Sequence, residues 1–167
     1  EQLSPEVRRA EIVAELEQTL AAQANVEVGK PYTELTFDDA AGKPVALSTL
    51  IGPGKWVLID FWATWCGPCK REIPHLAEAY EEFRDKGFEI YGVSLDSDAE
   101  AWKSYVADHG MNWVNVLGTG SDEARAQIDL YAVQSIPSNF LISPDGIIVA
   151  KNLRGAAVRE KLAEMLE

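Results

Sequence analysis

The chain of 167 residues has few of the side chains that bind metals or cross-link small domains, with two cysteines and two histidines. Two cysteines cannot build a framework of several disulfides. His75 and His109 lie far apart in the sequence, and there is no second pair of closely spaced cysteines to complete a four-ligand zinc site. We therefore expect no structural metal and no organic cofactor.

Long apolar segments and an excess of positive charge are also missing. No stretch approaches the roughly 20 apolar residues of a membrane-spanning helix, and no signal-peptide core is visible. Fifteen basic and 27 acidic residues give a net charge of -12, which argues against nucleic acid or an anionic membrane as a partner. The chain starts at Glu1 rather than Met, as expected of a processed form that has lost an upstream signal, domain or membrane tether.

Both cysteines lie in one segment, residues 56–74, which reads WVLIDFWATWCGPCKREIP. Residues 56–62 are β-branched and aromatic and are bounded by glycine and proline, so they predict a buried strand. Apolar residues then recur at steps of three and four, which predicts a helix over residues 68–86 with one apolar face. Cys66 is therefore expected at the helix N-terminus, with Cys69 about one turn further in.

This placement gives the two cysteines different chemistry. Free backbone N–H groups and the helix dipole stabilise an anion, so the pKa of the Cys66 thiol should fall from about 8.5 toward 7 or below. Cys66 would then be a nucleophile, and Cys69 the resolving thiol that attacks a mixed disulfide. Covalent haem attachment would need a histidine directly after the second cysteine, where the chain has Lys70.

The order of strand, tryptophan, Cys-Gly-Pro-Cys and helix, with Pro74 five residues after the second cysteine, resembles the active site of the thioredoxin superfamily. Two short extended pieces within residues 34–47 predict a hairpin before this strand. With the long stretch between Cys69 and Pro137, this hairpin resembles the TlpA/ResA branch, extracytoplasmic thiol-disulfide oxidoreductases related to the peroxiredoxins.

The resemblance implies an α/β protein with a thioredoxin-like fold, in which helices flank a central mixed β-sheet and an N-terminal β-hairpin and a helical insert are added. We assign this domain to residues 30–167 and an N-terminal helix or linker to residues 1–29. It also implies an extracytoplasmic location in a bacterial envelope, with a cytoplasmic one as the alternative. A capping box from Ser97 to Glu100 predicts the start of a helix in the insert.

Two acidic residues are candidates for proton handling. Asp60 lies inside the apolar strand, where burial would raise its pKa, and it matches the thioredoxin aspartate that accepts the proton of the resolving cysteine. The alternative is an acid at the strand end that faces solvent. Glu72 matches an active-site glutamate of ResA-like proteins, and its alternative is an exposed helix acid.

The resemblance also implies a substrate groove. Pro137 resembles the cis-proline that lies opposite the cysteines in this superfamily. A cis bond would turn the Ile136 backbone toward the substrate, where it could pair with an extended peptide. The other residues expected at the groove are Thr64, Trp65, Gly67 and Pro68.

The predicted function is thiol-disulfide exchange that reduces protein disulfides, with an upstream thiol as electron donor. Gly-Pro between the cysteines, as in thioredoxin, favours a potential nearer about -270 mV than about -120 mV. One alternative is a binding module whose affinity the dithiol switches. Another is a thiol peroxidase, but the peroxiredoxin pattern Pro-x-x-x-Thr-x-x-Cys would need Pro and Thr where this chain has Ile59 and Ala63.

Overall fold

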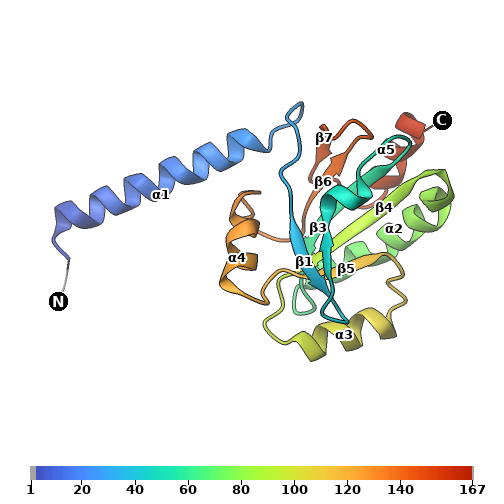
Figure 1. Ribbon diagram of the computed structural model, residues 1–167, viewed down its shortest axis with the longest axis horizontal. Helices are drawn as coiled ribbons and strands as arrows, with labels where there is room; N and C mark the ends of the chain where they lie inside the picture. The colour runs from blue at the N-terminus through green and yellow to red at the C-terminus, as the bar shows by residue number, and fades with distance from the viewer. Residues whose placement is uncertain (1–2, 167) are drawn as a thin grey trace.

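The computed structural model describes residues 3–166, which form a mixed β-sheet with helices on both faces (Figure 1). The strands are β1 Thr36–Asp39, β2 Pro44–Ala46, β3 Trp56–Trp62, β4 Phe88–Ser94, β5 Val114–Leu117, β6 Ser138–Ile142 and β7 Ile148–Lys151. The helices are α1 Pro5–Asn25, α2 Gly67–Phe83, α3 Ala99–Asp108, α4 Asp122–Asp129 and α5 Ala157–Leu166, with 3-10 turns at Leu47–Leu50 and Arg84–Lys86. The expected thioredoxin-like α/β fold is confirmed.

The strand that leads to the cysteines lies inside the sheet. Across the described chain the strand order is β2-β1-β5-β4-β3-β6-β7, in which β3 pairs parallel with β4 and antiparallel with β6. Leu58 and Trp62 of β3 pack into a cluster with α2, α3 and α5. Ile59 and Phe61 face the opposite cluster, which includes α4. Because both faces of β3 are covered, its sequence is apolar almost throughout.

The N-terminal hairpin and the helical insert are both present. β1 and β2 pair antiparallel, and β1 also pairs antiparallel with β5, so the hairpin extends the sheet at one edge. The insert between β4 and β6 contains α3, β5 and α4. The predicted capping box at Ser97 is wrong, because Asp98 caps α3 by accepting hydrogen bonds from the N–H groups of Glu100 and Ala101.

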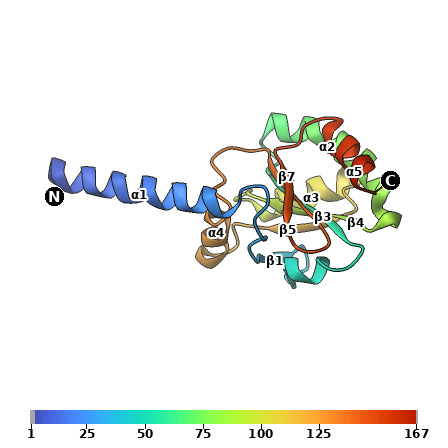
Figure 2. The same cartoon turned by 90° about the horizontal axis from the view of Figure 1, so that it is seen from above.

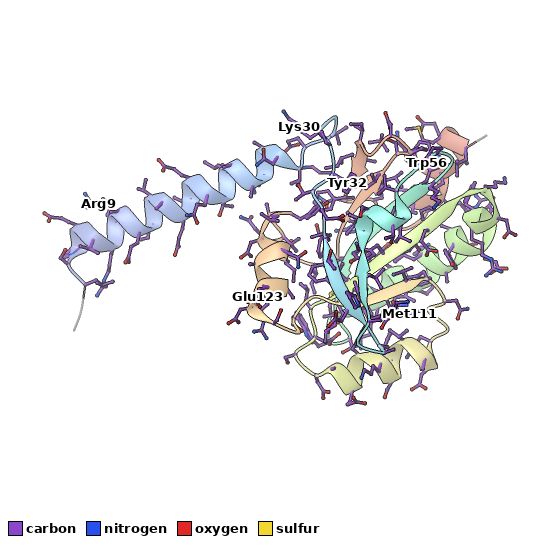
Figure 3. All side chains as sticks on the ribbon, viewed as in Figure 1. Arg9, Lys30, Tyr32, Trp56, Met111 and Glu123 are labelled. Atoms are coloured by element: carbon purple, nitrogen blue, oxygen red, sulfur yellow. A yellow bond between two sulfur atoms is a disulfide. The ribbon has the colours of Figure 1, made fainter. Side chains whose placement is uncertain are left out.

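Helix α1 projects from the domain as a single rod (Figures 1 and 2). Ser4 caps it, and none of its residues is buried. Most of its side chains, Arg9 among them, point into solvent (Figure 3), whereas Thr19, Ala22 and Gln23 near its C-terminal end are half-buried. The backbone joins the domain just after the helix, where the Gly29 N–H donates to the Ile148 carbonyl at 2.8 Å. The division between residues 29 and 30 stays a prediction.

Among the described residues no helix combines the length and apolar character needed to cross a membrane.

Candidate active site

The two cysteines lie where β3 ends and α2 begins. Cys66 is the N-cap of α2, and Cys69 lies in its first turn. They are joined as a disulfide, with their Cα atoms 5.2 Å apart. The Cys69 N–H donates to the Cys66 sulfur at 3.2 Å, so the helix N-terminus offers Cys66 a donor that would also stabilise a thiolate.

The segment before β6 lies close to the sulfur of Cys66. The Ile136–Pro137 peptide bond is cis, as the sequence resemblance predicted. The carbonyl oxygen of Ile136 lies 3.7 Å from the Cys66 sulfur. A backbone acceptor that a peptide could use therefore borders the reactive sulfur.

A groove of about 520 Å³ opens beside Cys66. Of the residues expected there, Trp65, Gly67, Pro68 and Ile136 line it, whereas Thr64 and Pro137 are not among its lining residues. Trp65 is 68% exposed. Four lining residues were not foreseen from the sequence: Leu95, Val133, Gln134 and Ser135. None of the lining residues is charged, so the groove favours apolar and backbone contacts with a ligand.

Asp60 is enclosed on the α2 side of the sheet. It is 6% exposed, and it shares its face of β3 with Leu58 and Trp62, which pack in the same cluster as Cys69. Desolvation is the largest effect and raises the pKa of the Asp60 carboxyl to about 7, with Arg154 lowering the pKa and Glu72 raising it. A carboxyl with this pKa can exchange a proton at neutral pH.

Glu72 connects α2 to the loop after β7. Its carboxylate accepts a hydrogen bond from the Gly155 N–H at 2.8 Å. Its negative charge also acts on Asp60, whose pKa it raises. Glu72 is thus half-buried and bonded, and not a free acid on the helix surface.

Asp96 braces the turn before the cysteines and was not foreseen. It is 2% exposed and accepts hydrogen bonds from the Thr64 hydroxyl and the Ser94 hydroxyl, both at 2.6 Å. The Thr64 N–H also donates to it at 3.1 Å. Asp96 closely follows β4, which is parallel to β3. The carboxyl ends of parallel neighbours meet at one edge of a sheet, so this position could have been found from the sequence.

Of the tryptophans and histidines of the described chain, only Trp65 lines the groove. Trp62, Trp102 and Trp113 are 1%, 1% and 7% exposed, as expected of core residues. His75 and His109 are exposed. In the part of the chain that the structure describes, no group of three or more His, Cys, Asp or Glu residues could hold a metal ion.

Known proteins are similar to this chain both in sequence and in fold. A family model described as the AhpC/TSA family matches residues 28–151. The thiol-disulfide oxidoreductase ResA of Bacillus subtilis (strain 168) is 35% identical over 129 residues, which cover 77% of this chain and 69% of ResA. ResA of Bacillus thuringiensis (strain Al Hakam) is 31% identical over 147 residues, which cover 88% of this chain and 81% of the relative.

A solved structure extends this similarity to the fold. The thioredoxin domain of a thiol-disulfide oxidoreductase from Bacteroides vulgatus superposes with a TM-score of 0.78 at 35% identity, covering 84% of this chain and 99% of that domain. Fold and site thus define a thioredoxin-like protein with a redox-active cysteine pair. The chain belongs to the AhpC/TSA family, in its group of ResA-like thiol-disulfide oxidoreductases.

Proposed function

We propose that this chain reduces disulfide bonds in protein substrates by thiol-disulfide exchange. The observation that carries the proposal is the position of Cys66, whose sulfur accepts a helix N-terminal N–H at 3.2 Å and borders an uncharged groove. The first feature favours the thiolate, and the second gives a polypeptide access to it. The names of the ResA relatives support the same reaction.

The proposed reaction starts from the reduced dithiol. The Cys66 thiolate attacks one sulfur of the substrate disulfide, whose S–S bond breaks and releases a substrate thiolate that takes up a proton. Asp60, as its carboxylate, then accepts the proton of the Cys69 thiol. The Cys69 thiolate attacks the Cys66 sulfur and releases the second substrate thiolate. Two electrons pass to the substrate, and the chain is left with the disulfide described here.

Substrate binding would use the groove beside Cys66. An extended segment pairs with the Ile136 backbone, while Trp65, Gly67 and Pro68 contact its side chains. Thr64 and Asp96 hold the turn that presents Trp65. Glu72 acts on the second half of the reaction, because its charge helps to keep the pKa of Asp60 near neutrality.

An upstream thiol donor would return the disulfide to the dithiol. We propose an extracytoplasmic location in the bacterial envelope, which the TlpA/ResA resemblance supports, with a membrane tether in the precursor. Cell fractionation with an antibody against the chain tests this location. Recovery only in the cytoplasmic fraction would contradict it.

Insulin reduction with dithiothreitol tests the activity, with Cys66→Ser as the matched control. We expect the unaltered chain to exceed the uncatalysed rate and the control to match it. A chain that does not exceed the uncatalysed rate would favour the redox-regulated binding module instead. Peroxide consumption by the Cys69→Ser variant tests the peroxidase alternative, and Ile59 and Ala63 predict a low rate.

A further inference from the structure

Arg154, in the loop between β7 and α5, bonds to its own loop and to the segment that lies beside the disulfide. Its guanidinium donates one hydrogen bond to the Leu153 carbonyl at 3.1 Å and another to the carbonyl of Pro137. Pro137 is the cis-proline whose preceding carbonyl borders the Cys66 sulfur. The side chain therefore ties its own loop to the segment that faces the disulfide.

The loop that carries Arg154 is held in place on both sides of it. The Asn139 side chain accepts from the Leu153 N–H and donates to the Leu153 carbonyl, both at 2.8 Å. On the other side, the Gly155 N–H donates to the Glu72 carboxylate at 2.8 Å. Asn139 is 3% exposed. The exposed Arg154 side chain thus starts from a backbone whose position is fixed by buried and half-buried partners.

The charged groups around Asp60 show why a positive charge from Arg154 affects its carboxyl group. Its cross-strand neighbours, Gly92 on β4 and Asn139 on β6, carry no charge. Helix α2 brings the negative Glu72 and the Cys69 sulfur to the same side of the sheet. The loop after β7 brings Arg154, whose positive charge lowers the pKa of Asp60 against burial and Glu72.

We propose that Arg154 is a positioning residue for the exchange reaction: it fixes the Pro137 segment opposite the disulfide, and it places a positive charge on the loop that is bonded to Asn139, the cross-strand neighbour of Asp60. The inference rests on the proposed function, in which Asp60 must be a carboxylate to accept the proton of Cys69. It assigns two effects to one side chain, a geometric effect through the Pro137 carbonyl and an electrostatic effect on the acid.

The chemistry of arginine allows the two effects to be separated. A guanidinium is a planar fork that can donate to two carbonyl groups at once, whereas a lysine ammonium carries the same charge as a single point. Arg154→Lys should therefore keep most of the electrostatic effect and lose part of the geometric one. Arg154→Met, of similar length and without charge, should lose both.

The direct test is a titration of the Asp60 carboxyl carbon by NMR in the oxidised, full-length chain. The unaltered protein should titrate near 7, Arg154→Met about one pH unit higher, and Arg154→Lys close to the unaltered protein. Arg125→Met, which removes an exposed cation on α4, is the matched control and should not shift the curve. If Asp60 titrates at the same pH in Arg154→Met as in the unaltered protein, the electrostatic effect is overturned. It is also overturned if Arg154→Lys shifts the Asp60 titration as far as Arg154→Met does.

Insulin-reduction kinetics test the geometric effect. For Arg154→Lys we expect KM to rise about tenfold, as for the loss of one charge-assisted hydrogen bond, with little change in kcat. An unchanged KM in this variant would overturn the geometric effect. If the unaltered chain does not reduce insulin, the proposed function fails, while the Asp60 titration still decides whether Arg154 acts on the acid.

Discussion

The two sulfurs of the disulfide face different surroundings. Cys66 lies at an uncharged groove bordered by the Ile136 carbonyl and receives a backbone N–H. Both cysteines are buried, with Cys66 6% and Cys69 2% exposed, and both pack in the cluster on the Asp60 side of the sheet, but Cys69 is not among the residues that line the groove. One cysteine is thus placed to meet a substrate and the other to exchange a proton. In the proposed reaction the backbone activates the first and a side chain the second.

The largest expected effects come from replacing either cysteine by serine, because the two cysteines have different roles in the proposed reaction. Cys66→Ser should lower the exchange rate at least about 10³-fold, because a serine hydroxyl is not ionised at neutral pH. Cys69→Ser should still attack once and then accumulate a mixed disulfide, because no resolving thiol remains. Non-reducing gel electrophoresis with a disulfide-containing protein detects the trapped species. Accumulation in the Cys66→Ser variant instead would reverse the two roles.

Loss of the acid should affect only the second half of the reaction. Asp60→Asn should slow release from the mixed disulfide by about 10²-fold at pH 7, a typical effect of a general base, and leave the first attack nearly unchanged. Stopped-flow measurement of the two phases checks this. Glu72→Gln keeps the acid and changes only the charge that acts on it. It should move the pH profile of release to lower pH, because Glu72 raises the pKa of Asp60. A slower first phase in Asp60→Asn would contradict the division.

The same acid should lower the stability of the oxidised chain as pH rises. The folded state holds a proton on Asp60 up to about 7, whereas an exposed aspartate releases it near 3.8. Stability should therefore fall between these two values and level off above the higher one. Relative to the unaltered chain, Asp60→Asn should gain up to about 4 kcal/mol between pH 4 and pH 8. Urea unfolding at both pH values measures this gain, and an equal difference at both would contradict a buried acid.

A substitution in the groove beside Cys66 should weaken substrate binding and leave the rate of the chemical steps unchanged. Trp65 is exposed and is one of the residues that line the groove. Trp65→Ala should raise KM about tenfold and keep kcat within about twofold, as expected for one lost aromatic contact. Trp65→Phe should retain most of the affinity. Steady-state insulin reduction measures both constants, and a drop in kcat at unchanged KM would argue against a binding role.

The features that sequence could predict are local. The strand at residues 56–62, the helix that carries Cys69 and the hairpin follow from periodicity and turn residues close together in the chain. The cis bond before Pro137 came from family resemblance, because periodicity carries no signal for it. The cap of α3 was misplaced by one residue, since Ser97 and Asp98 are both good caps and only the backbone conformation decides between them.

The features that sequence could not predict depend on contacts between distant segments. Alternation could not choose the face of Asp60, because β3 is covered on both faces. Arg154 gave no signal, since its role depends on the Pro137 carbonyl and on a loop tied to Asn139 and Glu72. The groove likewise combines the turn at Trp65 with residues that follow α4.

The division between the two sulfurs can be measured directly by alkylation. The reduced chain is treated briefly with a substoichiometric amount of iodoacetamide at pH 7, and the modified peptide is identified by mass spectrometry. We predict modification of Cys66 with little on Cys69, because only Cys66 combines the helix N-terminus with the open groove. Equal modification of both cysteines, or preferential modification of Cys69, would contradict the account.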